Sequence, residues 1–123
     1  MTTLKVRIES MADTLSRAAE AFKSAESGLL TERSSDTLAF GSWEAMHRTL
    51  APKRLEIVRC MAGQGAMTVR DVARAVGRDI KNVHADLDLL AKAGVINRVQ
   101  GGGFEFDYDL IHFEFDIKAD NAA

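Results

Sequence analysis

The fold encoded by this sequence is organised around the stretch Gly77-Arg78-Asp79-Ile80-Lys81-Asn82-Val83-His84. Gly77 permits a sharp turn, and Asp79 is a favourable N-cap residue for a helix that follows it. From this point apolar residues recur at positions 80, 83, 87 and 90, within about 80° of one another on a helix. The spacing predicts an amphipathic helix whose apolar face packs on the preceding helix.

The preceding helix is predicted over residues 69–76. Thr68 stands at its N-cap, and Asp71 occupies the capping-box position three residues later. Its inner face is formed by apolar residues at helical spacing, namely Val69, Val72, Ala73 and Val76. Two capped helices joined by a glycine turn, the second with a polar and partly basic outer face, indicate a helix-turn-helix.

A β-hairpin is predicted directly after these helices. Residues 95–100 and 104–107 are two short strand patterns, and three consecutive glycines, 101–103, turn between them. A glycine tip carries no side chain, so it can approach a phosphate backbone closely. The hairpin extends the prediction to a winged helix-turn-helix.

The beginning of the chain reads as a strand over residues 4–9, a helix over 11–27 and a connector over 29–36. A unit of this size cannot bury its own apolar faces, so it must pack on the later domain or on a second copy. We therefore divide the chain into an N-terminal strand-helix extension with its connector, residues 1–36, and a winged helix-turn-helix domain with a C-terminal strand, residues 37–123.

Two further helices are predicted between these parts. A short extended piece covers residues 37–40, and Ser42 then caps a short helix. That helix is expected to bury Trp43, Met46 and Leu50. Pro52 suits the first turn of the next helix.

The clearest strand pattern is the alternation of apolar and polar residues over 111–117. An exposed edge this apolar would aggregate, so it must be covered. We expect it to pair with the strand at 4–9 of the same chain or of a partner chain, which would make a homodimer. The predicted fold class is α+β.

Composition and charge are those of an ordinary globular protein, with 46% apolar and 28% charged residues and a net charge of −2. The charge is uneven, because residues 52–100 carry +4 and the remainder carries −6. No apolar run can span a bilayer and the start lacks a secretory signal. Cys60 is the single cysteine, and we expect it to be a buried, reduced thiol in a cytoplasmic protein without membrane contact.

The predicted DNA-binding residues divide into two groups. Those expected to read bases in the major groove are Arg78, Lys81, Asn82 and His84. Those expected to contact phosphates are Thr68, Arg70 and Arg98. The alternative is that these side chains are solvated charges on a helix face. Asp86 and Asp88 oppose DNA binding, because carboxylates are repelled by phosphates.

Catalysis and metal binding receive little support. His112, Glu114 and Asp116 share one face of the last predicted strand and could be imagined as metal ligands. A solvent-facing strand side explains the same alternation without a metal. No nucleophile elbow, paired-cysteine motif or phosphate loop is present, so neither an enzyme nor a cofactor is expected.

Four strings resemble a MarR-like winged-helix family of transcriptional regulators in bacteria and archaea. They are Leu50-Ala51-Pro52-Lys53-Arg54-Leu55, Gly77-Arg78-Asp79-Ile80-Lys81-Asn82-Val83-His84, Ala93-Gly94-Val95-Ile96 and Asp107-Tyr108-Asp109. The resemblance covers residues 37–117. Some members of that family are the antitoxin half of a two-gene toxin–antitoxin pair, so the resemblance implies DNA binding, autorepression and a toxin protein as a possible partner.

This sequence departs from the family pattern at three positions. Ala51 stands where the pattern usually has threonine, so the helix at Pro52 lacks a side-chain cap. Ala85 and Asp88 stand at or near places that are commonly basic. We predict a double-stranded-DNA-binding regulator, with a winged-helix protein–protein module that does not bind DNA as the alternative.

Overall fold

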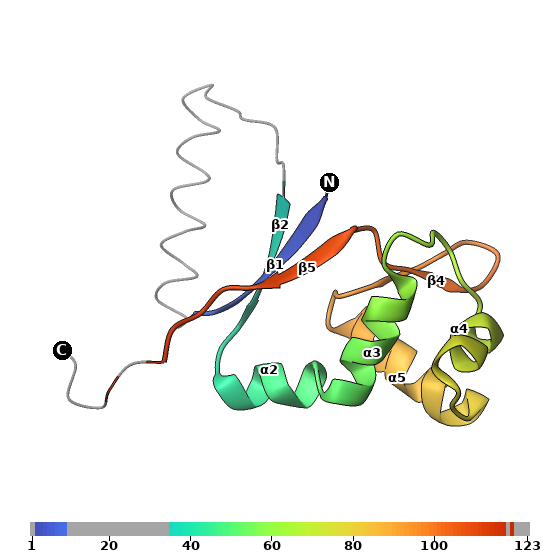
Figure 1. Cartoon of the computed structure of the whole chain (residues 1–123), viewed down its shortest axis with the longest axis horizontal. Helices are drawn as coiled ribbons and strands as arrows, with labels where there is room; N and C mark the ends of the chain where they lie inside the picture. Colours follow the sequence, from blue (N-terminus) through green and yellow to red (C-terminus); the bar gives the residue numbers. More distant parts are fainter. Residues whose placement is uncertain (1, 10–34, 118, 120–123) are drawn as a thin grey trace, which may run out of the picture.

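A computed structural model describes residues 2–9, 35–117 and 119 of the chain and shows an α+β architecture (Figure 1). The strands are β1 (Thr3–Ile8), β2 (Ser35–Phe40), β3 (Asn97–Arg98), β4 (Phe104–Glu105) and β5 (Leu110–Phe113). The helices are α2 (Trp43–Thr49), α3 (Pro52–Met61), α4 (Val69–Val76) and α5 (Ile80–Lys92). The helix predicted over 11–27 and most of the connector over 29–36 lie outside the described residues.

A three-stranded parallel sheet joins the two ends of the chain. β1 lies in the centre, with β2 on one side and β5 on the other. The register places Val6 opposite both Leu38 and Phe113. The predicted pairing between the first and last strands is therefore confirmed within one chain. β5 is shorter than the predicted strand over 111–117, because its pairing with β1 ends at Phe113.

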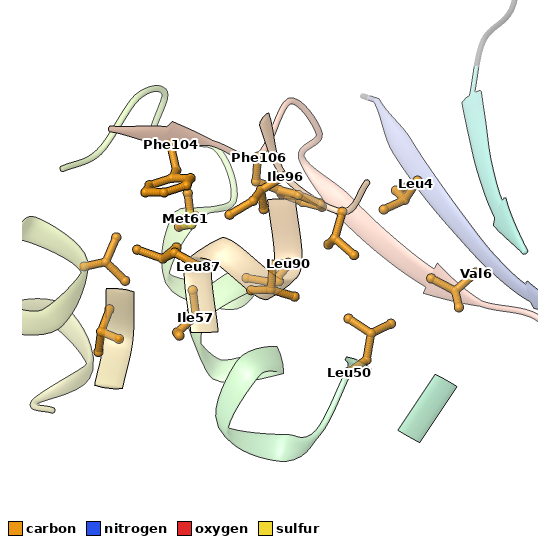
Figure 2. Packing of buried hydrophobic residues seen from close by; sticks show 14 of the residues in the cluster. Leu4, Val6, Leu50, Ile57, Met61, Leu87, Leu90, Ile96, Phe104 and Phe106 are labelled. Atoms are coloured by element: carbon orange, nitrogen blue, oxygen red, sulfur yellow. The ribbon is translucent and has the colours of Figure 1, made fainter. Parts of the chain in front are cut away.

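One hydrophobic core connects this sheet to the helices. Leu4 and Val6 of β1 are buried in the same cluster as residues from α2, α3 and α5. Figure 2 shows these two side chains on the side of β1 that faces Leu50 and Leu90. The described part of the N-terminal extension thus packs on the later domain. β2 starts at Ser35, so it crosses the predicted boundary between residues 36 and 37.

The two helices before the turn begin as the sequence predicts. The Ser42 hydroxyl accepts a hydrogen bond from the backbone N–H of Ala45 (3.1 Å), and Pro52 opens α3 without a side-chain cap at Ala51. The prediction that Trp43 is buried was wrong, because this residue is 38% exposed. Trp43 is the first residue of α2, where it packs edge-on against the ring of Phe115 instead of entering the core.

α4 and α5 are joined as predicted. The capping box between Thr68 and Asp71 is present, Gly77 adopts the left-handed conformation (φ 68°), and the Asp79 carboxylate caps α5. The inner face of α5 departs from the prediction at Ile80, which is 48% exposed. Ile80 is the first helical residue, and the buried part of this face begins one turn later, at Val83.

The β3–β4 hairpin is tied to the segment before α4. Phe104 and Met67 exchange two backbone hydrogen bonds of 2.8 Å. Gly103 lies against this bridge with φ 100°, and a Cβ atom there would stand 2.8 Å from the carbonyl oxygen of Met67. The paired strands are shorter than the predicted segments 95–100 and 104–107. Val95, Ile96 and Phe106 lie outside the paired residues, and their side chains are buried in the core.

Cys60 is half-buried rather than buried, and burial together with the nearby Glu56 carboxylate raises the pKa of its thiol. In the part of the chain that the structure describes, no helix has both the length and the apolar character needed to cross a membrane.

Replacing Gly103 by alanine is expected to destabilise the protein more than replacing Gly102. Both glycines have φ near 100°, so both substitutions carry a backbone cost of about 1–3 kcal/mol. A Cβ at Gly102 meets nothing within 4 Å, whereas one at Gly103 clashes with the Met67 carbonyl. Chemical denaturation should show Gly103→Ala to be at least about 1 kcal/mol less stable than Gly102→Ala. Equal stabilities would contradict the close approach of the hairpin to Met67.

Candidate nucleic-acid interface

One surface of the molecule is formed by α4, the outer face of α5 and the β3–β4 hairpin. Six of the seven predicted DNA-binding residues are exposed on these elements or at their ends: Thr68, Arg70, Lys81, Asn82, His84 and Arg98. The seventh, Arg78, is half-buried, with 27% of its side chain exposed. Most of the outer face of α5 is open to solvent, since Lys81, Ala85 and Lys92 are exposed and only Asp88 is partly covered.

The caps of α4 and α5 use some of the groups that were predicted to bind phosphate. The Thr68 N–H donates to the Asp71 carboxylate (3.2 Å), and the Thr68 hydroxyl accepts from the Asp71 N–H (3.1 Å). Hydrogen bonding of the Asp71 carboxylate to the backbone and side chain of Thr68 lowers the pKa of Asp71, and the charge of Arg74 lowers it further. At the start of α5 the Asn82 N–H donates to the Asp79 carboxylate (3.2 Å). The amide side chain of Asn82 takes no part in the cap.

Asp86 lies at the centre of a buried ion cluster between α3, α5 and the turn. The residue is 5% exposed. Its carboxylate accepts hydrogen bonds from Arg78 Nη2 (2.7 Å) and Arg54 Nη1 (3.0 Å), and Lys53 Nζ stands 3.8 Å away. Arg54 also donates from Nε to the carbonyl of Thr49 (2.7 Å) and from Nη2 to the carbonyl of Arg48.

The cluster changes the expected roles of two residues. Burial alone would raise the pKa of Asp86, but the hydrogen bonds from Arg78 and Arg54 and the charge of Lys53 outweigh it and leave that pKa below its ordinary value. The Asp86 carboxylate, which was expected to oppose DNA binding, is therefore paired inside the protein and is not presented to the outer face of α5. The guanidinium of Arg78 is held at the junction of the turn and α5, where it stabilises the orientation of this helix.

Arg98 of the hairpin is attached to the outer face of α5. Its Nη2 donates to Asp88 Oδ1 (2.8 Å), and its guanidinium lies 5.3 Å above the centre of the Phe104 ring. His84 Nε2 stands 3.7 Å from the other oxygen of Asp88. The hydrogen bond from Arg98 lowers the pKa of Asp88, and the electrostatic effects of His84, Arg98 and Lys92 lower it further. Asp88 thus positions the hairpin against α5 and neutralises part of the charge of Arg98.

Where α4 meets the first turn of α5, Arg70 and Lys81 are exposed and form no ion pair with another described residue, and the exposed Arg74 acts only through its charge on the Asp71 carboxylate. Arg70 and Arg74 line a shallow hollow together with Ala73, Gly77, Arg78 and Ile80. The sequence reading missed Arg74 and the exposure of Ile80. Arg74 could have been found, because it follows Arg70 by four residues and so lies on the same side of α4.

The described residues contain no group of three or more His, Cys, Asp or Glu side chains placed to hold a metal ion. His112, Glu114 and Asp116 are all exposed. The pKa of Glu105 is raised, because its carboxyl group shares a hydrogen bond with that of Asp107.

Asp86→Asn is expected to destabilise the protein by about 3–5 kcal/mol. The substitution keeps the size of the side chain but leaves two largely buried guanidinium groups without a counter-charge. Asp88→Asn is the matched control. The Asp88 carboxylate is more exposed and also pairs with an arginine, so its loss should destabilise the protein much less than the loss of the Asp86 carboxylate. Comparable unfolding free energies for the two variants would contradict the structural role of the cluster.

The contribution of Asp86 should also depend on pH. Its pKa in the folded protein lies below the ordinary value of 3.8, so its charge stabilises the fold fully above that value. This stabilisation is lost as the pH falls through the lowered pKa. The difference in unfolding free energy between the wild type and Asp86→Asn is therefore expected to be constant from pH 7 to pH 5 and to shrink below about pH 4. A difference that grows on acidification would exclude the ion cluster as its source.

Residues 49–113 match the model of the HVO_A0114 protein family. A comparison of the chain with curated individual proteins found no match. The matched segment runs from the end of α2 through α3, α4, α5 and the hairpin to the end of β5, so it contains both the ion cluster and the exposed cationic surface. Because this segment is more than half of the 123 residues, the chain belongs to the HVO_A0114 family.

Proposed function

We propose that this protein is a double-stranded-DNA-binding transcriptional regulator in which α3, α4, α5 and the β3–β4 hairpin act as a winged helix-turn-helix. One observation carries the proposal. α5 buries one face in the core and leaves most of the opposite face exposed, and the exposed cations Lys81, Arg70 and Arg74 lie at its first turn and on the adjacent α4. A helix presented in this way can enter a major groove, while neighbouring cations hold the phosphate backbone.

Base reading is assigned to the first two turns of α5. Asn82 has a free amide side chain that can form two hydrogen bonds with an adenine, and Lys81 can donate to the acceptors of a guanine. His84, one turn later, is exposed on the same outer half of the helix. Arg78 was predicted to read bases as well. Its ion pair with Asp86 supports a positioning role instead, since a base contact would require breaking a 2.7 Å charge-assisted hydrogen bond.

Phosphate contacts are assigned to α4 and the hairpin. Arg70 and Arg74 project from the same side of α4, next to the start of α5, where a backbone flanking the groove would pass. The tip formed by Gly101 and Gly102 has no side chain to obstruct a second backbone segment. Arg98 lies beside it and remains more than half exposed while bonded to Asp88. These positions form a path of positive charge on either side of α5.

The proposed functional unit is a homodimer. A few phosphate contacts per chain give weak binding at physiological salt, and two copies on two half-sites add their contributions. The MarR-like resemblance supports autorepression and, for a cytoplasmic antitoxin, a toxin protein as a second partner. These two roles rest on the resemblance alone.

A winged-helix protein–protein module is the second candidate. One observation favours it, namely that two of the arginines predicted to contact DNA are already bonded to carboxylates of the same chain. Such a module would use the same surface without a preference for nucleic acid. DNA-binding measurements therefore separate the two functions.

The test is binding of the full chain to duplexes by fluorescence anisotropy at several salt concentrations. The probes are a duplex that the protein selects from a random library and a scrambled duplex of the same composition. Arg70→Ala should weaken binding to both duplexes and reduce the slope of log Kd against log salt by about one. Asn82→Ala should cost about 1–3 kcal/mol on the selected duplex and little on the scrambled one.

Arg59→Ala is the control for this experiment. Arg59 is a highly exposed arginine of α3 that borders the groove between α3 and β5, away from the α4–α5 surface, so its loss should leave binding unchanged. Absence of salt-dependent binding to any duplex, or an Arg70→Ala variant that binds like the wild type, would overturn the assignment.

A further inference from the structure

Ile80 is a large apolar side chain exposed within a cationic surface. It is the first residue of α5 and is 48% exposed. Arg70, Arg74 and Arg78 line the same hollow. The other large apolar side chains that are exposed in the described residues are Trp43, Leu89, Leu110 and Ile117. None of them lies at the start of α5.

The position of Ile80 determines what it can touch. Residues in the first turn of a helix that enters a major groove are the ones that reach base edges. His84 follows one turn later on the same side of α5, so the two side chains are neighbours along the helix. Arg70 and Arg74 flank Ile80 on the side of α4. A duplex held by these arginines would bring a base edge to the exposed side of Ile80.

The aliphatic side chain of Ile80 can contact only an apolar group of a base pair favourably. An isoleucine side chain neither donates nor accepts a hydrogen bond, so it gains nothing from the donors and acceptors of adenine, guanine or cytosine. The apolar group that a base pair presents in the major groove is the C5-methyl group of thymine. Burying a methyl group against an aliphatic side chain removes apolar surface of both from water.

We propose that Ile80 is a specificity-determining residue that contacts the C5-methyl group of one thymine in each half-site. This inference rests on the proposed DNA-binding function and names one feature of the sequence that is bound. A contact with thymine would also explain why the apolar side chain of Ile80 is exposed, which packing within the described part of the chain does not explain. Removing the methyl group alone should weaken binding about four- to tenfold.

The experiment removes that methyl group without altering any hydrogen-bonding group of the base pair. The full chain selects a duplex from a random library, and each thymine of that duplex is then replaced in turn by uracil. Dissociation constants are measured by fluorescence anisotropy for the wild type, Ile80→Ala, Ile80→Gln and Leu89→Ala. Leu89 is the matched control, because it is an exposed apolar residue in the C-terminal half of the same helix.

The expected result is a single uracil position per half-site at which the wild type loses four- to tenfold in affinity. Ile80→Ala and Ile80→Gln should bind the thymine and uracil duplexes at that position equally well, whereas Leu89→Ala should retain the difference. Ile80 is half-exposed, so both variants are expected to unfold at nearly the wild-type temperature. Two substitutions of different polarity separate a lost methyl contact from a local disturbance of α5.

Other outcomes would contradict either the thymine contact of Ile80 or the proposed DNA-binding function on which it rests. If the wild type binds all uracil duplexes like the parent, or selects a site without thymine, Ile80 does not read a methyl group although DNA binding stands. The same holds if both Ile80 variants keep the sensitivity to uracil. If the wild type selects and binds no duplex, the proposed function itself fails.

Discussion

The buried carboxylate of Asp86 is the constraint on which the arrangement of the helices depends. Burial of Val83, Leu87 and Leu90 turns the apolar face of α5 inward, but apolar contacts are not directional and leave some freedom of rotation. A carboxylate that accepts from Arg78 at the turn and from Arg54 on α3 restricts this rotation further. Arg54 is itself held by two carbonyl groups at the end of α2. The orientation of the outer face of α5 therefore depends on charged groups inside the protein as well as on its apolar face.

The hairpin is positioned by a second set of contacts that converge on the same helix. Its backbone is joined to the segment before α4 through Met67 and Phe104, and its Arg98 is joined to α5 through Asp88. Asp88 weakens the attraction to phosphate that we propose for α5, but its bond to Arg98 also fixes the distance between this helix and the hairpin. The bond between Arg98 and Asp88 thus reduces the positive charge available on this surface and holds the hairpin in a defined position against α5. The exposed cations Arg70, Arg74 and Lys81 lie where α4 meets the first turn of α5.

Much of the architecture followed from local signals. The N-caps at Ser42, Thr68 and Asp79, the glycine turn and the final strand each depend on a few neighbouring residues, so their spacing along the chain was sufficient to predict them. Pairing of the first and last strands was also inferred, because an apolar strand must be covered. The exposed DNA-binding candidates, such as Arg70, Lys81 and Asn82, were found in the same way from the polar side of a helix.

Other features needed the tertiary structure, because they depend on residues that are distant in the chain. Position on a helical wheel cannot show that Asp86 points toward an arginine 32 residues earlier, nor that Arg78 turns inward to meet it. Exposure of Ile80 and Trp43 was missed because periodicity identifies an apolar face but not where the neighbouring element stops covering it. The sequence thus defined the helices, the turn and most of the candidate site. Packing between distant elements decided which charges are neutralised inside the fold and which remain exposed on its surface.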